Sequence, residues 1–278
     1  MAMTDLEFVK GFTRLCDDGF RQGWHERNGG NLSYRLTADD VAAAREYFDP
    51  EPRPWVQMGV SAPSMAGEFF MATASGSYMR NILDHTPEYT GIVEINDAGD
   101  AWRTRWGYTL GGRPTSEFES HFMNLAVRAE ADGGRCRVCY HAHTPAIIEM
   151  SFIVPLDDRT FTRLLWQMMT ECVVVFPQGV GVVPWMVPGG PAIAAATSEK
   201  MRSYTTAVWA HHGLFATGAD FDEAFGLLHT VEKAAQVYVG ARAANGGSDD
   251  FLNKIQDKGL RDTCRDFDIA INEAFLDD

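Results

Sequence analysis

Long hydrophobic runs and clusters of basic residues are missing from this sequence. No apolar stretch approaches the roughly 20 residues that a helix needs to cross a bilayer. The N-terminal MAMTDLEFVK has acidic residues where a secretory signal would have basic residues followed by an apolar run. The formal net charge of −14 at pH 7 argues against binding to nucleic acids or acidic membrane surfaces. We therefore expect a globular protein of the cytoplasm.

Cysteine is also scarce. Five cysteines are an odd number, which fits reduced intracellular thiols better than a disulfide framework. Cys136 and Cys139 form a C-x-x-C motif, but residues i and i+3 of a strand point to opposite faces. A zinc knuckle would also need a second cysteine pair, and none follows. Two buried strand thiols are the simpler interpretation.

The chain has 278 residues and 45% hydrophobic content, enough for a substantial core. Apolar residues at helical spacing predict helices over 4–24, 116–131, 158–171, 191–204 and 220–244, and two shorter ones within 248–276. Apolar runs predict strands over 31–36, 68–75 and 172–177, a strand or a strand pair over 207–218, and a hairpin of 91–96 with 101–107. Residues 37–67 contain four prolines and predict irregular excursions. We expect one α/β domain over 1–278 with a mixed sheet covered by helices.

Two histidines stand two residues apart at the end of an apolar run, in RCRVCYHAHTPAII (135–148). In a strand, His141 and His143 would share one face at a Cα separation of about 7 Å, which suits two ligands of one metal ion. Catalytic zinc usually has three protein ligands and an open position. The third ligand would come from His211 or His212, which end the apolar run of VWAHHGLFATG. Adjacent strand residues face opposite ways, so only one of this pair is expected to face the metal.

The segment GGRPTSEFESHF supplies a carboxylate beside small polar residues. Ser116 and Glu119 form a predicted capping box, which places Glu117 at the first helical position, where the helix dipole favours an anion. The free N–H groups of that turn and the hydroxyls of Thr115 and Ser116 would also bind an anion. Two other small-residue loops, RNGGN (27–31) and ASGS (74–77), could complete a phosphate cradle, which an acidic protein with an anionic ligand requires. We interpret His25, His85, His121 and His229 as structural.

These motifs together resemble the class II (metal-dependent) sugar-phosphate aldolases. The resemblance is carried by GWHERNGGNLSYRL, ASGSYMRN, RPTSEF, HAHTP, TECVVVFPQGVGVVPWMVPG, HHGLFATG and FGLLHTVEKAAQV, in the order of the family, over residues 5–240. Residues 240–278 match poorly and are expected to be a helical extension of the single domain. The resemblance implies a three-layer α/β/α sandwich with a mixed, largely antiparallel sheet. It also implies a homotetramer with active sites near the subunit contacts.

The resemblance also implies roles for particular residues. His141, His143 and His212 match the ligands of one Zn²⁺ ion per subunit, Glu117 matches the catalytic acid–base group, and Glu171 matches a carboxylate that acts across the subunit interface. The positions that hold the substrate phosphate are matched by Asn28, Asn31, Ser75, Gly76, Thr115 and Ser116. Glu171 is also unusual by placement, because a carboxylate at the C-terminal end of a predicted helix opposes the helix dipole.

The activity implied is a lyase reaction of carbohydrate catabolism. The chain has only five lysines, none at a predicted strand end, so a Schiff base is disfavoured and a Lewis-acidic metal is the alternative for stabilising a carbanion. The expected reaction is retro-aldol cleavage of L-rhamnulose 1-phosphate to dihydroxyacetone phosphate and L-lactaldehyde. The ligand is thus a small sugar phosphate, with no nucleic acid or membrane partner.

Other reactions on the same scaffold remain open at this stage. They are fuculose- or ribulose-phosphate aldol chemistry, 4-epimerisation of a pentulose phosphate and dehydration of a thio-sugar phosphate. A non-catalytic adducin-like head domain is disfavoured because every ligand position is filled. A cupin-type iron enzyme would use His-x-His followed by Glu149, but the spacing is off by one and the long helices contradict an all-β fold.

Overall fold

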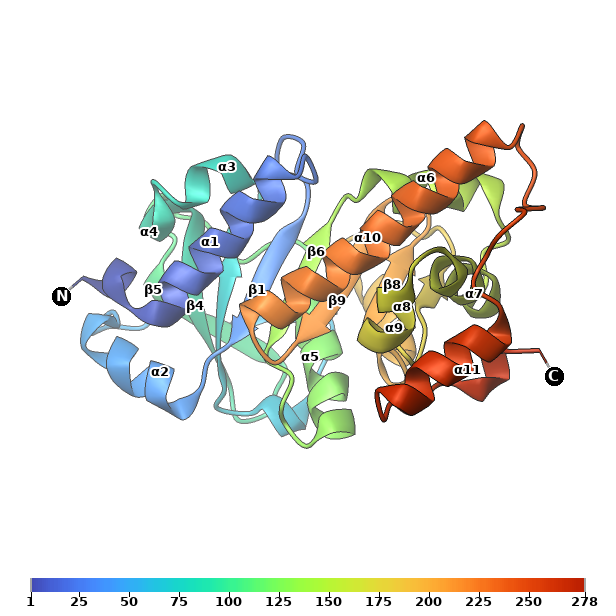
Figure 1. Cartoon of the computed structure of the whole chain (residues 1–278). Coiled ribbons are helices and arrows are strands. Elements are labelled where there is room, and N and C mark those ends of the chain that lie inside the picture. Colours follow the sequence, from blue (N-terminus) through green and yellow to red (C-terminus); the bar gives the residue numbers. More distant parts are fainter. Residues whose placement is uncertain (1, 278) are drawn as a thin grey trace.

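The computed structural model describes residues 2–277 and shows a nine-stranded sheet between two helical layers (Figure 1). The strands are β1 (Asn31–Arg35), β2 (Val56–Gln57), β3 (Phe69–Thr73), β4 (Thr90–Ile95), β5 (Ala101–Gly107), β6 (Val138–Ala142), β7 (Gly181–Val183), β8 (Thr206–Trp209) and β9 (Gly213–Gly218). Their order in the sheet is β2-β5-β4-β3-β1-β6-β9-β8-β7. Every neighbouring pair is antiparallel except β7 with β8.

The helices cover both faces of this sheet. They are α1 (Glu7–Arg21), α2 (Ala38–Ala44), α3 (Met79–Ile82), α4 (Thr86–Tyr89), α5 (Phe118–Asp132), α6 (Pro145–Ile153), α7 (Asp158–Met168), α8 (Thr170–Val175), α9 (Pro191–Met201), α10 (Phe221–Ala244) and α11 (Asp257–Asp266). In Figure 1, α1 and α10 cross the front of the sheet. Within residues 2–277, no helix is long and apolar enough to cross a membrane.

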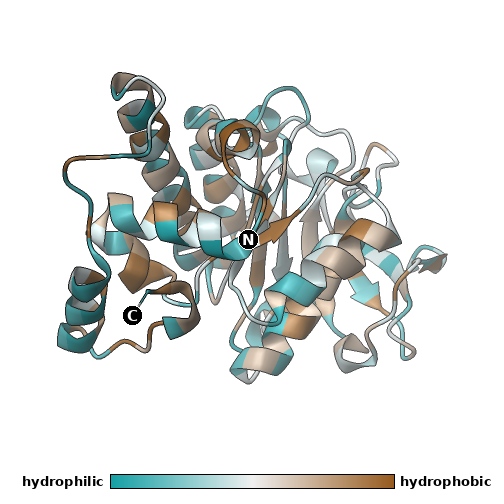
Figure 2. Cartoon of the chain, turned by 90° about the vertical axis from the view of Figure 1, so that its right-hand side faces the viewer, coloured by the Kyte–Doolittle hydropathy of each residue, from teal (hydrophilic) through white to brown (hydrophobic). Residues whose placement is uncertain are grey.

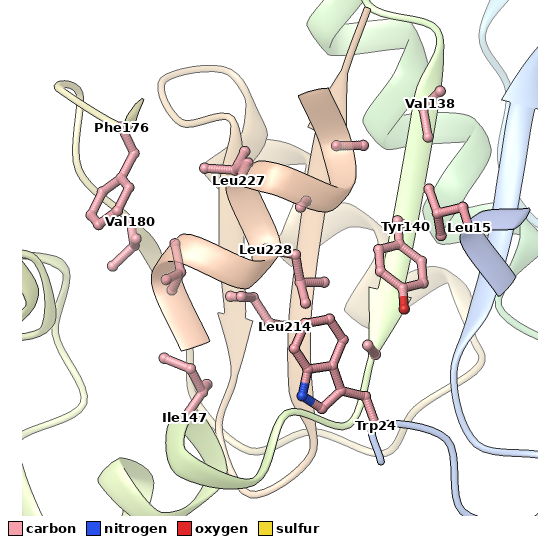
Figure 3. Close-up of a cluster of buried hydrophobic side chains, with 14 of the residues drawn as sticks. Leu15, Trp24, Val138, Tyr140, Ile147, Phe176, Val180, Leu214, Leu227 and Leu228 are labelled. Carbon is pink, nitrogen blue, oxygen red and sulfur yellow. The ribbon is translucent and has the colours of Figure 1, made fainter. Parts of the chain in front are cut away.

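Strand alternation divides the core into two clusters, one on each face. On β6, Tyr140 belongs to the cluster under α1, α6, α7 and α10, whereas Cys139 belongs to the cluster under α5 and α9. Figure 3 shows part of the first cluster, where Leu15, Leu214 and Leu228 from three elements lie together around Trp24 and Tyr140. Figure 2 shows hydrophilic and hydrophobic residues alternating along the flanking helices. The predicted three-layer α/β/α sandwich with a mixed, largely antiparallel sheet is confirmed.

Several sequence-based element predictions are wrong in detail. The predicted strand 172–177 is instead helix α8 and the residues after it, and α8 is separated from α7 by the extended Met169. The predicted capping box is absent: Glu117 is itself the N-cap residue of α5, and the Glu119 carboxylate accepts from the Gly59 N–H at 2.7 Å. Residues 37–67 are less irregular than predicted, because they contain α2 and β2. Helix α6 was not predicted.

The C-terminal residues pack against the body of the domain. Leu260, Cys264 and Phe275 belong to the same buried cluster as the central strands. Arg163 on α7 donates to the Asp257 carboxylate at 2.9 and 3.1 Å and to the Phe275 carbonyl at 2.7 Å. Of the two predicted helical segments, one is α11 and the other is only a short 3-10 turn over Glu273–Phe275.

All five cysteines are free and buried. They lie in different parts of the fold: on α1, before and on β6, on α8 and on α11 (Cys16, Cys136, Cys139, Cys172 and Cys264). Cys136 and Cys139 are buried thiols, as predicted, but Cys136 precedes β6 and both belong to the α5 cluster, so the expectation of opposite strand faces is wrong. Burial raises the pKa of Cys136 to about 12, which keeps this thiol protonated and unreactive.

A buried carboxylate holds the start of α6. Glu232 of α10 is fully buried and accepts from the backbone N–H groups of Ala146 and Ile147 at 3.0 and 3.1 Å. These are two of the N-terminal donors that a helix cannot satisfy internally. Because α6 begins directly after Thr144, Glu232 also fixes where the His-x-His segment ends.

We expect Glu232→Ala to lower the free energy of unfolding by about 2–4 kcal/mol, since it leaves two buried N–H groups without acceptors. Glu232→Gln retains one acceptor oxygen, so its loss should be smaller. Urea denaturation of the metal-free protein measures both changes. Glu199→Ala, which removes an exposed carboxylate on α9, is the matched control and should change stability by less than about 1 kcal/mol. Equal losses for Glu232→Ala and Glu199→Ala would contradict this role.

Candidate active site

The β6 strand presents His141 on the α5 face of the sheet. Its ring is fully buried and stacks on Phe215 of β9, its cross-strand partner, at a centroid distance of 4.2 Å. The Nδ1 atom donates to the Leu214 carbonyl at 3.1 Å. This contact fixes the tautomer and leaves the Nε2 lone pair free to bind a ligand.

His143 lies just beyond the end of β6. Its backbone N–H donates to the Trp24 carbonyl at 3.1 Å, and its Nδ1 lies 2.6 Å from a carboxylate oxygen of Glu26. A carboxylate on one ring nitrogen orients an imidazole and makes the other nitrogen a better metal ligand. Glu26 was not predicted as a site residue, although it lies in GWHERNGGNLSYRL, the motif that contains RNGGN.

The turn between β8 and β9 separates the two adjacent histidines. His211 has a left-handed backbone (φ 62°), is exposed, and its ring contacts Phe152 on α6 at a centroid distance of 4.5 Å. His212 instead turns toward His143. The following residue must be glycine, because a Cβ at Gly213 would lie 2.3 Å from the Ala142 carbonyl oxygen. Of this pair, only His212 lies against His143, whereas His211 contacts α6.

The three imidazoles His141, His143 and His212 converge. One nitrogen from each lies within 4.8 Å of the others, and the Nε2 atoms of His143 and His212 are 3.0 Å apart. A tetrahedral zinc ion with nitrogen ligands at 2.0–2.1 Å would separate such nitrogens by about 3.3 Å. The three residues can therefore hold one metal ion with a small adjustment.

The protonation state of the histidine rings also fits the binding of a cation. The Nε2 atom of His141 is buried, and no hydrogen-bond partner for it exists among residues 2–277. A buried polar atom without a partner is costly unless a ligand satisfies it. Burial and the neighbouring imidazoles hold the pKa of His141 well below its usual range, and burial lowers the pKa of His212 to about 4. Both rings are thus neutral at pH 7, as metal binding requires.

Glu117 lies beside the three imidazoles. Its Oε2 is 3.6 Å from His141 Nε2 and its Oε1 is 3.9 Å from His212 Nε2. The Asn31 amide donates to Oε2 at 2.7 Å. Burial raises the pKa of Glu117, while the hydrogen bond from Asn31 opposes that rise. A mostly buried carboxyl group with a raised pKa is suited to give and take protons near neutral pH.

Two of the predicted phosphate loops are held side by side. The Ser75 N–H donates to the Arg113 carbonyl and the Thr115 N–H donates to the Thr73 carbonyl, both at 2.9 Å, so 74–76 and 114–116 form one continuous rim. Ser75, Gly76 and Ser116 are exposed there, whereas Thr115 is buried and its hydroxyl accepts from the Glu117 N–H at 3.3 Å.

The 27–31 loop, the third predicted phosphate loop, also contributes to the site. Asn28 is exposed, and Asn31 starts β1 as the cross-strand partner of His141. Gly30 has φ of 73°, and a Cβ there would lie 2.8 Å from the His141 carbonyl oxygen, so this close approach requires glycine. The amide of Asn31 is engaged by Glu117, which the phosphate prediction did not anticipate.

Glu171 is not brought to the three histidines. It lies exposed in the first turn of α8, where a carboxylate complements the helix dipole, so the prediction of an unfavourable C-terminal position is wrong. The error follows from the break at Met169, which makes two helices of the single predicted one. The only metal-compatible cluster within residues 2–277 consists of His141, His143 and His212.

Comparison with known sequences gives a consistent result. The profile of the class II aldolase and adducin N-terminal domain family matches residues 11–239. A rhamnulose-1-phosphate aldolase of Pectobacterium atrosepticum is 44% identical over 239 residues, which are 86% of this chain and 87% of that protein. A rhamnulose-1-phosphate aldolase of Yersinia pestis is 41% identical over 239 residues, with the same two shares.

Solved structures share the fold. A sugar-phosphate aldolase from Thermotoga maritima matches with a TM-score of 0.71 at 23% identity, over 87% of this chain and 97% of that one. The L-fuculose-1-phosphate aldolase from Thermus thermophilus matches with a TM-score of 0.57 at 21% identity, over the same shares. From the profile match and the identity to curated relatives, the chain belongs to the class II aldolase and adducin N-terminal domain family.

Proposed function

We propose that the protein is a zinc-dependent lyase that cleaves L-rhamnulose 1-phosphate to dihydroxyacetone phosphate and L-lactaldehyde. The observation that carries the proposal is the convergence of three imidazoles on one point, with the Glu117 carboxylate 3.6–3.9 Å from two of them. The relatives at 41–44% identity, which bear the name rhamnulose-1-phosphate aldolase, support the choice of substrate. We assign His141, His143 and His212 as the ligands of one Zn²⁺ per subunit.

The reaction breaks the bond between C3 and C4 of the ketose phosphate. The C4 hydroxyl gives its proton to a base as C4 becomes the aldehyde carbon, a role we assign to Glu171 of the partner subunit, and the bonding electron pair stays on C3, next to the ketone. A bound divalent cation supplies Lewis-acid stabilisation of the negative charge that develops on the ketone oxygen. Glu117 then delivers a proton to C3, which completes dihydroxyacetone phosphate. Its raised pKa and its burial against the imidazoles fit that role.

A lysine-based mechanism has less support in the fold. A Schiff base needs a desolvated lysine beside the substrate. Lys10, Lys233 and Lys258 lie on helices α1, α10 and α11, and Lys200 on α9 is paired with Asp158 at 2.8 Å. Lys254 follows α10 and is exposed.

We propose that the phosphate group binds at the rim formed by 74–76 and 114–116 and by the 27–31 loop. Hydroxyls, backbone N–H groups and amides would hold it without lysine or arginine, so the binding residues are Asn28, Asn31, Ser75, Gly76, Thr115 and Ser116. Exposed donors at Ser75 and Ser116, with a left-handed Gly76 between strand and helix (φ 77°), support this assignment.

We expect Ser75→Ala to raise KM for the ketose phosphate about tenfold with kcat nearly unchanged. The hydroxyl would bind the phosphate equally in the ground and transition states, and a hydrogen bond to a charged group contributes about 1.5–3 kcal/mol. Steady-state kinetics measures the effect. Ser248→Ala, in the exposed segment after α10, is the control. A fall in kcat with KM unchanged would place Ser75 in the chemistry rather than in phosphate binding.

The proposal is tested with a panel of ketose phosphates. Purified protein should release dihydroxyacetone phosphate from L-rhamnulose 1-phosphate faster than from L-fuculose 1-phosphate, and should show no activity toward unphosphorylated L-rhamnulose. Chelation should abolish cleavage and stoichiometric Zn²⁺ should restore it. Activity that survives complete metal removal, or epimerisation of L-ribulose 5-phosphate without cleavage of any ketose 1-phosphate, would refute the proposal.

We further propose a single domain over 1–278, assembled as a homotetramer in the cytoplasm. The packing of α11 against α7 and α8 supports treating 240–278 as part of that domain. The exposed position of Glu171, away from its own histidines, supports a role in the site of a neighbouring subunit as a second acid–base group. Five buried free thiols support a reducing compartment.

A further inference from the structure

A chain of buried polar groups runs behind the Glu117 carboxylate. The Asn31 amide nitrogen donates to Glu117 Oε2 at 2.7 Å, and the Asn31 amide oxygen is hydrogen-bonded to Nε2 of His121. Asn31, Glu117 and His121 are 6%, 8% and 0% exposed, so water does not compete for these contacts. These hydrogen bonds join β1 to the start of α5, where Glu117 and His121 lie four residues apart.

The direction of these hydrogen bonds follows from the Asn31 amide. Its NH₂ donates to Glu117 Oε2, so its oxygen faces His121 and accepts. The histidine must then carry its proton on Nε2. Burial lowers the pKa of His121 to about 3, against a smaller opposing effect of the Cys139 backbone, so the ring is neutral and has one proton to place.

In the competing arrangement, each of these hydrogen bonds would run in the opposite direction. With the ring proton on Nδ1, toward the Cys139 backbone, Nε2 would accept from Asn31 and the amide oxygen would face Glu117. The contacts of the ring oppose this, because Nε2 is hydrogen-bonded to Asn31, whereas the Cys139 backbone lies near the ring without a well-formed hydrogen bond to Nδ1. A reversed amide would also place its oxygen against an ionised carboxylate, which is repulsive.

We propose that His121 is a positioning residue: through Asn31 it fixes the Glu117 carboxylate for proton transfer. It does not belong to the three-histidine cluster, and it reaches Glu117 only through the Asn31 amide and through the α5 backbone, where the His121 N–H donates to the Glu117 carbonyl at 3.1 Å. The chain engages Oε2 and leaves Oε1, which faces His212, free to carry the proton. This inference rests on the proposed function of Glu117.

Replacing His121 by methionine and by glutamine separates positioning from packing. Met fills the ring volume without a donor, whereas the Gln amide can place an N–H where Nε2–H lies. We expect kcat for ketose phosphate cleavage to fall about 10- to 100-fold in His121→Met and to stay within about threefold in His121→Gln. Adding His121→Met to Asn31→Ala should lower kcat no further. Phe122→Leu, a core change on the next residue, should lower stability but not kcat.

Two readouts do not depend on activity. Crystal structures of the metal-free proteins should show the Asn31 amide on Glu117 in wild type and His121→Gln, and displaced in His121→Met. Neutron diffraction on wild-type crystals should find the His121 proton on Nε2; this needs no variant to fold. The inference is overturned by a proton on Nδ1, by an unchanged Asn31–Glu117 contact in His121→Met, or by equal kcat losses in the Met and Gln variants. A wild-type protein without cleavage activity would refute the proposed function, while the diffraction results would still decide whether His121 orients Asn31.

Discussion

Replacing His143 by alanine is expected to remove the bound zinc and to lower kcat/KM for L-rhamnulose 1-phosphate at least about 1,000-fold. His143 and His212 lie with their Nε2 atoms 3.0 Å apart, so loss of one ring leaves two ligands, which is one fewer than catalytic zinc usually has. Lewis-acid stabilisation is worth several kcal/mol, and each 1.36 kcal/mol is tenfold in rate. The measurements are metal content by mass spectrometry after dialysis and cleavage kinetics on the same samples.

The adjacent pair in the β8–β9 turn offers a matched control for metal content. His211→Asn removes an imidazole next to a proposed ligand and keeps a side chain that tolerates the left-handed backbone there. We expect this variant to retain one zinc per subunit, whereas His212→Ala should lose it. Full zinc content together with full activity in His143→Ala would rule out the proposed site.

Changing Glu117 to glutamine is expected to lower kcat about 10²- to 10⁴-fold, the range for loss of a general acid–base group, with metal content unchanged. The Gln side chain retains an oxygen that can accept from Asn31, so the local structure should be preserved. Because burial already disfavours the charged carboxyl, the neutral amide should not lower the thermal midpoint.

The partial reaction that Glu117 is proposed to catalyse can be followed directly. Wild-type protein should exchange one hydrogen of the hydroxymethyl carbon of dihydroxyacetone phosphate, the former C3 of the ketose, with deuterated water, as seen by NMR, and Glu117→Gln should not. The control is Glu119→Gln, because the Glu119 carboxylate is hydrogen-bonded to the Gly59 N–H instead. This variant should exchange at the wild-type rate. Exchange by Glu117→Gln at the wild-type rate would assign the proton transfer to another group.

The motifs that carry the site were predictable from the sequence because strand geometry is regular. A period of two residues places His141 and His143 on one side, and the cross-strand register then brings Asn31 opposite His141. The choice between His211 and His212 was not decidable by alternation, since both lie in a tight turn rather than in a strand. Only the resemblance to a family selected His212.

Helix α8 shows why local preference failed elsewhere. The three consecutive valines of CVVVFP favour a strand, but Cys172, Val173 and Phe176 are buried while Val175 is exposed, which is a helical pattern. Packing against α7, α10 and α11 therefore outweighs the preference of β-branched residues. The same break that begins α8 moved Glu171 from the end of a predicted helix to the start of a real one.

The hydrogen bonds that hold Glu117 through Asn31 and His121 could not be predicted from the composition. His121 was interpreted as structural because no partner was visible along the sequence, although its spacing of four residues from Glu117 does put both on one helix face. Its link to Asn31 spans 90 residues and exists only once β1 is laid beside β6 under α5. Glu26, 117 residues from His143, was missed for the same reason.

The five buried thiols can report on how the protein unfolds. Because Cys16, Cys172 and Cys264 sit on three helices and Cys136 and Cys139 flank the start of the central strand, each reports on a different region. Brief pulses of an alkylating reagent, followed by peptide mass mapping, would therefore show the order in which those regions unfold. The same measurement with a metal ion bound to the histidine cluster would show whether the ion delays unfolding of the central strand more than unfolding of the C-terminal helix.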